Sequence, residues 1–429
     1  MKTINVVTLG CSKNVVDSEH LMAQAAAAGY RVNFDSNSTR AKIVVINTCG
    51  FINDAKQESI DTILSFAAAR SAGRIERLFV MGCLSERYAD ELREAIPEVD
   101  EFFGVRTFEG VLKALEVERK AELETERVLT TPRHYAYLKI AEGCDRRCGY
   151  CAIPLIRGGH VSVPIETLVK EAEWLASQGV KELMVIAQDT TFYGIDLYGK
   201  RKLAELLKAL CRVDGIEWIR LHYAYPASFP RDVIEVMRDE PKICKYLDIP
   251  LQHISDNQLR SMKRSIDKAG TVKLIADLRA AIPDLAIRTT MLVGYPGETD
   301  ADFAELKEFV KEAKFERLGV FTYSAEEGTY SADCLADDVP ESVKQARADE
   351  LMELQSAISY GCNERRVGRT ERVIVDGCVD GRWIARSQYD SPEVDTEIEI
   401  ITTKRLRKGA FYDVRIVEAD EYDLTAELI

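Results

Sequence analysis

The feature that most constrains the fold is a regular alternation of strand-like and helical runs over the first 335 residues. In residues 1–128, a helical pattern follows each of the apolar runs TINVVTLGC, KIVVINTC and RLFVMGC. The first of these helices is expected at about 17–28. Gly29 follows that pattern, and glycine is common directly after the last helical residue. Strands that alternate with helices predict a parallel α/β sheet domain in this N-terminal segment.

The alternation continues through residues 129–363. Six candidate strands read YAYLKIAE, ELMVIAQ, EWIRLHYA, KYLDIPLQ, LAIRTTMLVG and RLGVFTYS, and a long connecting helix begins near Glu341. A full barrel needs eight βα units, so we predict a partial, open (βα)6 barrel. The charged run at 116–127, which precedes this segment, is interpreted as a solvated helix face or a linker.

The last segment, residues 364–429, has a different pattern. Its short apolar runs are TERVIVDG, RWIARSQ, TEIEIIT, AFYDVRIVEA and YDLTAEL. Five short strands in so small a segment predict a small antiparallel β-barrel.

Composition and charge limit the environment and the partners. The chain of 429 residues is 46% hydrophobic and 30% charged, which is typical of a soluble globular protein. It has no signal peptide pattern and no apolar run near the roughly 18 residues of a membrane helix. We therefore expect a cytoplasmic protein without membrane contact. A net charge of −14 favours basic partners over phosphates, but the clusters RRVGR and KRLRK leave direct nucleic-acid contact open.

The chain has 11 cysteines, which in a reducing compartment indicate metal binding, catalysis or burial. Five are isolated in or beside apolar runs and are expected to be structural: Cys211, Cys244, Cys334, Cys362 and Cys378.

A first group of three cysteines lies at strand ends. Cys11, Cys49 and Cys83 each follow a candidate strand of the N-terminal segment. The carboxyl ends of parallel strands face one crevice, so these thiols are expected to converge. Three buried structural cysteines are the alternative.

A second group, Cys144, Cys148 and Cys151, follows the first strand of the barrel segment, at the face where barrel active sites lie. Three thiols are one ligand short of a zinc site or an ordinary iron–sulfur site. A zinc site completed by His160 and a redox-active thiol pair are the alternatives.

The C-x3-C-x2-C spacing after a first barrel strand resembles the radical S-adenosylmethionine enzymes. The resemblance implies that Cys144, Cys148 and Cys151 hold a [4Fe-4S] cluster whose fourth iron binds S-adenosylmethionine. An electron, supplied by a donor such as flavodoxin, then cleaves the cofactor to a 5′-deoxyadenosyl radical that removes hydrogen from an unactivated carbon. Tyr150 stands where this superfamily often has an aromatic residue near the adenine.

Two three-cysteine groups with a small terminal barrel resemble the methylthiotransferases of that superfamily. The resemblance implies a second, auxiliary [4Fe-4S] cluster at Cys11, Cys49 and Cys83, and a TRAM-like barrel at 364–429 that takes part in substrate recognition. It also implies replacement of C–H by C–S–CH₃, with one S-adenosylmethionine supplying the methyl group and a second supplying the radical.

The sequence motifs around Cys11, Cys49 and Cys83 resemble those of one branch of the family. LGCSKNVVDSE, INTCGFINDAKQESI and MGCLSERY are similar to the branch that modifies the β-carbon of an aspartate of small-subunit ribosomal protein twelve, whereas the tRNA branch usually has Gln-Met-Asn after the first cysteine. An acidic enzyme also suits a basic ribosomal protein. A tRNA (adenosine) methylthiotransferase and a non-catalytic iron–sulfur or zinc scaffold are the alternatives.

The sequence gives only weak signals for other residues that could contact S-adenosylmethionine. Gln188 and Arg288 lie on or at the ends of candidate barrel strands, where a polar side chain can hold the cofactor's ribose or carboxylate. A structural polar role is the alternative, and Asp189, Gln252 and His253 are no better distinguished. No Walker A or G-x-G-x-x-G motif opens a helix, so no nucleoside triphosphate or dinucleotide is expected.

Overall fold

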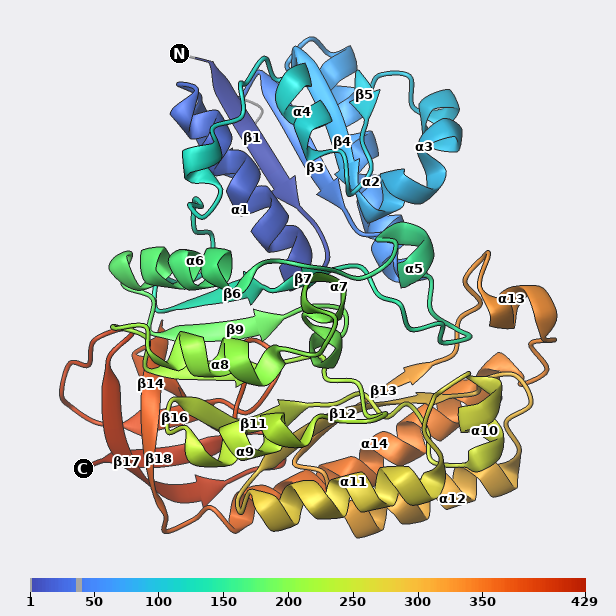
Figure 1. Ribbon diagram of the computed structural model, residues 1–429, viewed down its shortest axis with the longest axis vertical. Helices are drawn as coiled ribbons and strands as arrows, with labels where there is room; N and C mark the ends of the chain where they lie inside the picture. Colours follow the sequence, from blue (N-terminus) through green and yellow to red (C-terminus); the bar gives the residue numbers. More distant parts are fainter. Residues whose placement is uncertain (1, 36–40) are drawn as a thin grey trace.

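The structure is a computed structural model that describes residues 2–35 and 41–429. Three large sheets follow one another along the chain, and Figure 1 shows the N-terminal sheet stacked over the central one, with the C-terminal barrel beside the central sheet. Among the described residues, no helix is both long enough and apolar enough to cross a membrane.

The N-terminal sheet is parallel throughout, as the sequence predicts. Its strand order is β2-β1-β3-β4-β5, with β1 (Thr3–Thr8), β2 (Arg31–Phe34), β3 (Ile43–Thr48), β4 (Arg77–Gly82) and β5 (Glu101–Phe102). Its helices are α1 (Ser12–Ala27), α2 (Asn53–Ser71), α3 (Cys83–Ala95) and α4 (Phe108–Ala114). The helix expected at 17–28 begins earlier, at Ser12, because Gly10 takes a φ of +90° and turns the chain directly from strand to helix.

The central sheet is the open six-stranded barrel that the sequence predicts. All neighbouring strands are parallel, in the order β13-β12-β11-β10-β9-β6. The strands are β6 (Tyr135–Lys139), β9 (Glu182–Ile186), β10 (Trp218–Leu221), β11 (Ile243–Asp248), β12 (Ala286–Val293) and β13 (Arg317–Thr322). Strands such as β9 are buried along their whole length, as expected for a parallel sheet covered by helices.

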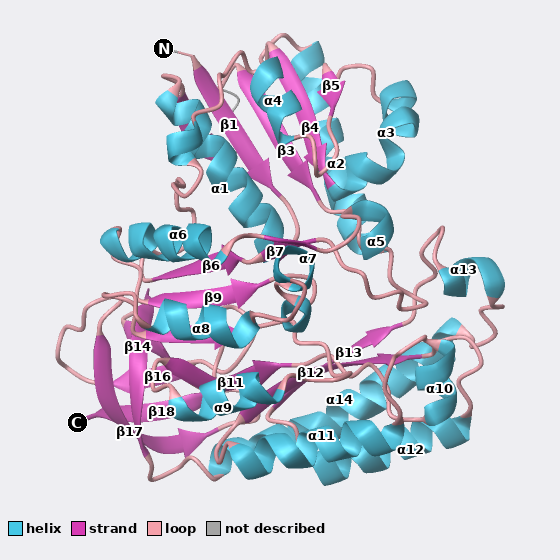
Figure 2. Ribbon diagram, in the orientation of Figure 1, coloured by secondary structure: helices cyan, strands magenta, loops and turns pink. Residues whose placement is uncertain are grey.

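Helices cover the outer face of this barrel (Figure 2). The longer ones are α6 (Ile165–Ser177), α8 (Leu203–Cys211), α9 (Arg231–Asp239), α11 (Lys268–Ala281), α12 (Asp300–Ala313) and α14 (Glu341–Glu364). Shorter elements in the connections are β7 (Ala141–Glu142), α5 (Ile153–Ile156), β8 (Val161–Ser162), α7 (Ile195–Tyr198), α10 (Asp256–Ser261) and α13 (Tyr330–Cys334). Apolar side chains of strands and helices form one large core.

The C-terminal segment forms a closed barrel in the order β14-β15-β16-β18-β17. Its strands are β14 (Thr370–Val379), β15 (Arg382–Ser387), β16 (Ile398–Ile401), β17 (Phe411–Ala419) and β18 (Leu424–Leu428). The predicted small barrel is confirmed, with one difference: β16 and β18 are parallel. Strand directions cannot alternate all the way round a closed ring with an odd number of strands, so at least one pair must be parallel.

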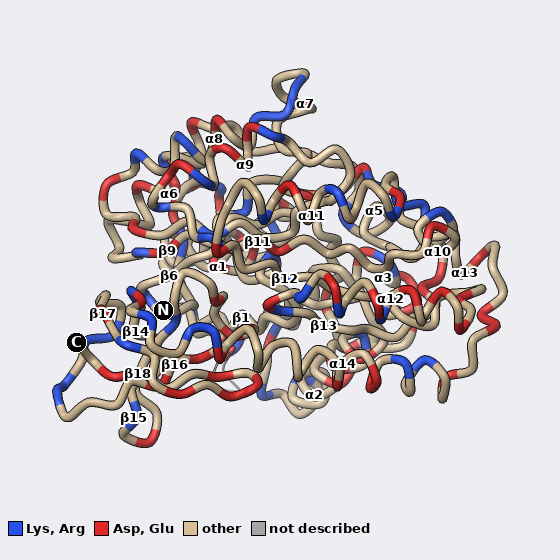
Figure 3. Tube along the Cα trace, turned by 90° about the horizontal axis from the view of Figure 1, so that it is seen from below, with Lys and Arg blue, Asp and Glu red and all other residues tan. Residues whose placement is uncertain are grey.

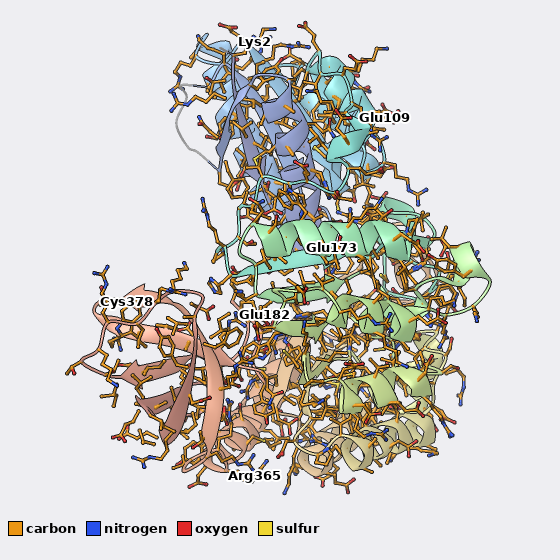
Figure 4. All side chains as sticks on the ribbon, turned by 60° about the vertical axis from the view of Figure 1, so that its left-hand side comes forward. Lys2, Glu109, Glu173, Glu182, Arg365 and Cys378 are labelled. Atoms are coloured by element: carbon orange, nitrogen blue, oxygen red, sulfur yellow. The ribbon has the colours of Figure 1, made fainter. Side chains whose placement is uncertain are left out.

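The C-terminal barrel closes the amino-terminal end of the central one. Glu182, between the two barrels in Figure 4, accepts a hydrogen bond from Arg220 at 2.8 Å and pairs with Arg386 at 2.8 Å. In the loop before β16, Glu393 accepts from the Tyr135 hydroxyl at 2.7 Å. The opposite, carboxyl end of the central barrel faces the N-terminal domain.

Candidate functional site

All six cysteines of the two predicted groups line one cavity of about 490 Å³. Figure 1 shows why they meet: β1, β3 and β4 end at the central barrel, close to the loop that follows β6 and β7. The structure therefore brings together two groups that the sequence places on different sheets. The other five cysteines lie elsewhere; Cys334 and Cys378 are exposed instead of packed in apolar surroundings, and Figure 4 shows Cys378 at the far side of the C-terminal barrel.

The N-terminal group is held by strand ends and helix starts. Cys11 directly precedes α1, Cys83 is the first residue of α3, and Cys49 follows β3 by one residue. The positive end of a helix dipole favours a thiolate. A Cβ added at Gly10 would lie 2.7 Å from the Cβ of Cys49, so only glycine allows this close approach. Three strand ends must therefore keep their register for this group to form.

A buried arginine from the central domain contacts the N-terminal group. Arg157 donates to Cys83 Sγ at 3.4 Å and to the side chain of Asn14, and its other nitrogen donates to Glu142 at 2.8 Å. Burial raises the pKa of the Cys83 thiol to about 12, although the positive charge of Arg157 acts in the opposite direction. Binding of a metal at this thiol must therefore displace a proton.

The second group lies in one short loop. A Cβ added at Gly143, where φ is +75°, would lie 2.1 Å from the carbonyl oxygen of Gly159. The Cys144 N–H donates to the Gly158 carbonyl at 2.9 Å, and the Cys151 N–H donates to the Cys148 carbonyl at 3.1 Å. Burial raises the pKa of the Cys144 and Cys151 thiols to about 12. Backbone hydrogen bonds thus hold both ends of this loop.

A second buried arginine contacts this loop from the far side of the barrel. Arg264 donates to Cys148 Sγ at 3.5 Å, to the Tyr150 hydroxyl at 3.3 Å and to the Pro250 carbonyl at 2.6 Å. Each cysteine group therefore has one arginine beside one sulfur. Such a cation offsets the negative charge that gathers where thiolates hold a metal centre.

Two of the three predicted cofactor residues, Tyr150 and Gln188, line the cavity. Gln188 donates to Glu142 at 3.0 Å, and its carbonyl oxygen is buried without a hydrogen-bond partner among the described residues. Arg288 is not brought to the cysteines. It lies near the amino end of β12, two residues before the cavity-lining Thr290, and pairs with Asp248 at 3.6 Å and Asp395 at 3.4 Å.

Sequence reasoning missed four cations that line the cavity. They are Lys13, Arg146, Arg157 and Arg264, and the cavity lining that the structure describes includes no aspartate or glutamate. One local signal was available: Lys13 lies in the first turn of α1, where the helix dipole disfavours a cation. Arg264 is far from the cysteines in sequence, and nothing in its neighbourhood marks it.

The donor sets fit iron–sulfur clusters better than single ions. Within residues 2–35 and 41–429, no three His, Cys, Asp or Glu side chains gather closely enough to hold one metal ion. A closed zinc site needs four such groups, and His160 lies 3.1 Å from Ser162 Oγ instead of completing one. In a four-iron cluster each thiolate binds a different iron, so the three thiols can lie farther apart than the ligands of a single metal ion.

Family comparisons agree with this fold. Residues 138–310 match the radical SAM superfamily, residues 3–104 match the uncharacterized protein family UPF0004, and residues 367–429 match the TRAM domain. The structure of TsrM from Kitasatospora setae, a radical S-adenosylmethionine methyltransferase with cobalamin and a [4Fe-4S] cluster bound, has a TM-score of 0.58 at 13% identity and shares the fold over 77% of each chain. Fold and site thus define a radical SAM enzyme, a class that implies S-adenosylmethionine and a [4Fe-4S] cluster.

Relatives of high sequence identity show which family of radical SAM enzymes the chain belongs to. The chain is 57% identical to the ribosomal protein uS12 methylthiotransferase RimO of Flavobacterium johnsoniae, over 99% of this chain and 97% of the relative. It is 53% identical to the protein of the same name from Bacteroides fragilis, over 100% of this chain and 99% of the relative. The chain therefore belongs to the ribosomal protein uS12 methylthiotransferase RimO family.

Proposed function

We propose that this protein inserts a methylthio group at the β-carbon of an aspartate of ribosomal protein uS12. One observation carries the proposal: two three-cysteine groups on different domains line one cavity. We assign the auxiliary [4Fe-4S] cluster to residues 1–128, through Cys11, Cys49 and Cys83. The radical [4Fe-4S] cluster belongs to residues 129–363, through Cys144, Cys148 and Cys151.

These cofactors explain why the chemistry needs two groups. When bound, the clusters and S-adenosylmethionine supply sulfur, a methyl group and hydrogen-atom removal from an unactivated carbon. The β-hydrogens of an aspartate are only weakly acidic beside an ionised carboxylate, so the side chains of this cavity cannot remove one as a proton at a useful rate. The protein's own task is to place the β-carbon where both groups reach it.

The polar lining on the side of Cys144, Cys148 and Cys151 fits the amino-acid portion of S-adenosylmethionine. Arg146 has a buried guanidinium nitrogen without a hydrogen-bond partner among the described residues, and Gln188 has a buried carbonyl oxygen in the same state. Both residues line the cavity. A carboxylate and an ammonium group would satisfy this donor and this acceptor.

Apolar residues line much of the remaining cavity and its mouth. Ala55, Ile153 and Pro250 exclude water from the space, which protects reactive species from side reactions. Phe51 and Ile52 also line the cavity and are each 39% exposed, so they form an apolar rim. A rim of this kind suits the entry of a loop from a protein substrate.

Charge on the outer surface supports a basic partner. Residues 318–343 include five exposed acidic residues and no Lys or Arg, and Figure 3 shows red stretches along the trace near α13. This segment reaches the N-terminal domain, where Glu326 pairs with Lys56 at 2.6 Å and Arg87 at 3.1 Å. We assign a part in substrate recognition to the barrel at 364–429 and expect electrons from a donor such as flavodoxin.

Anaerobic reconstitution with iron, sulfide, dithionite and S-adenosylmethionine tests the proposal. We expect mass spectrometry to find one methylthio group on the target aspartate of uS12, together with 5′-deoxyadenosine and S-adenosylhomocysteine. If a tRNA adenosine is methylthiolated while uS12 stays unmodified, the protein is a tRNA methylthiotransferase instead. Absence of 5′-deoxyadenosine despite full iron loading would indicate a non-catalytic scaffold.

A further inference from the structure

Lys13 places a buried positive charge in the cavity beside the N-terminal cysteine group. It is the second residue of α1, two residues after Cys11, and only 6% of its surface is exposed. Its ammonium group lies 3.1 Å from the centre of the Tyr223 ring. A cation–π contact of this kind fixes the position of the ammonium group without neutralising its charge.

The charge of Lys13 has no anionic partner among the described residues. No ion pair or side-chain hydrogen bond is formed by its ammonium group there, whereas Arg146 pairs with Asp189 at 2.9 Å and Arg157 pairs with Glu142 at 2.8 Å. Burial of an unpaired cation is costly, and the dipole of α1 adds to that cost because Lys13 lies in the first turn. A ligand anion would remove both costs.

Tyr223, whose ring contacts the Lys13 ammonium group, has an uncommon backbone conformation. Tyr223 has a φ of +56°, a left-handed conformation that bulky residues rarely adopt. Its N–H donates to Asp248 at 3.2 Å, which holds the backbone in place. Backbone strain of this kind is found at ligand-binding positions, which agrees with a role for the Lys13–Tyr223 pair in ligand binding.

Two carboxylates compete as the partner: that of the substrate aspartate and that of S-adenosylmethionine. Arg146 lies between Cys144 and Cys148 and has a free buried donor, so it suits the cofactor carboxylate. Lys13 instead comes from the N-terminal domain, next to the cysteine group assigned to sulfur delivery. We propose that Lys13 binds the side-chain carboxylate of the substrate aspartate and so determines the choice of aspartate as target.

This inference rests on the proposed function, and a pair of substrate peptides tests it. The peptides span the modified loop of uS12 and have either Asp or Asn at the target position. With reconstituted full-length Lys13→Gln, kcat/KM for the Asp peptide is expected to fall about 10- to 100-fold. The Asp-over-Asn preference should shrink by a similar factor, and Lys13→Arg should restore part of it.

Lys42→Gln is the matched control, since Lys42 is an exposed lysine that immediately precedes β3, at the opposite end of that strand from Cys49. It should match wild type with both peptides. For Lys13→Gln, iron content and the KM for S-adenosylmethionine should stay within about twofold of wild type.

Four results would overturn the inference. An equal loss for both peptides would show that Lys13 only balances cluster charge or supports the fold. A raised KM for S-adenosylmethionine with an unchanged peptide preference would assign Lys13 to the cofactor carboxylate. If wild type modifies neither peptide, the proposed function itself fails; if wild type modifies the Asp peptide and Lys13→Gln keeps the full preference, only the role of Lys13 is refuted.

Discussion

The two cysteine groups reach the same cavity by different means. Cys144, Cys148 and Cys151 come from one loop that backbone hydrogen bonds shape locally, whereas Cys11, Cys49 and Cys83 come from three strand ends. The first group depends on one loop and on central-domain residues such as Arg264 that contact it, and the second depends on the whole N-terminal sheet and on Arg157 from the next domain. Damage to either group should therefore have distinct consequences.

The largest expected effect is that cysteine substitutions in the two groups reduce different products. Cys148→Ala should abolish 5′-deoxyadenosine formation, because the group assigned to the radical cluster loses a ligand. Cys49→Ala should stop methylthio insertion but retain some cofactor cleavage. Chromatography of both products from anaerobic reactions measures this difference, and equal loss of 5′-deoxyadenosine in the two variants would contradict it.

A pair of glycine substitutions should show the same separation through the backbone. Gly143→Ala forces a Cβ to within 2.1 Å of a carbonyl oxygen, so cofactor cleavage should fall about 100-fold. The Cβ of Gly10→Ala would lie 2.7 Å from the Cβ of Cys49 and 3.4 Å from Asn14 Nδ2, both in the N-terminal domain, so methylthiolated product should fall more than cofactor cleavage does. The same ratio of the two products in both variants would show that the groups are not independent.

A smaller effect is expected from the arginine that joins the domains. Arg157→Met leaves Lys139 as the remaining cation that pairs with Glu142 and Asp17, so the cost should not exceed the about 3–5 kcal/mol of an uncompensated buried charge. Melting of the reconstituted protein should shift down by no more than roughly 10 °C. The melting temperature of Arg157→Lys should lie between those of wild type and Arg157→Met. Lysine keeps the positive charge, but it cannot contact both domains with two separate nitrogens as arginine does.

Arg264→Met serves as the comparison for that measurement. Among the described residues, Arg264 contacts the central domain alone, through Cys148, Tyr150, Pro250 and the Tyr225 ring. Its removal should reduce cofactor cleavage without the additional loss of stability that follows from separating two domains. An equal melting shift in Arg157→Met and Arg264→Met would argue against the joining role of Arg157.

Most of the fold could be predicted because it depends on local periodicity. All six strands of the central barrel and the five strands of the small barrel appear where apolar runs indicate them. The parallel pairing of β16 and β18 could not be read from either strand, because it follows from closure of the ring. The early start of α1 was missed because polar residues follow Cys11.

The site was predictable where its residues carry a local pattern. The cysteines follow strands or share one short loop, so spacing was enough to group them. Arg157, Arg264 and Lys13 act across domain or barrel distances, and single-sequence patterns do not contain such contacts. Arg288 lies on a barrel strand as predicted, but two residues before the cavity-lining Thr290, because the sequence does not show how far along the strand the cavity begins.

Iron content tests the central claim, two separate three-thiol cluster sites, most directly. Anaerobically reconstituted wild-type protein should contain about eight irons per chain, since each cluster has four. Replacement of Cys11, Cys49 and Cys83 together by alanine should leave about four, and replacement of Cys144, Cys148 and Cys151 should also leave about four. About four irons in wild type, or zinc in place of iron at either group, would contradict the account.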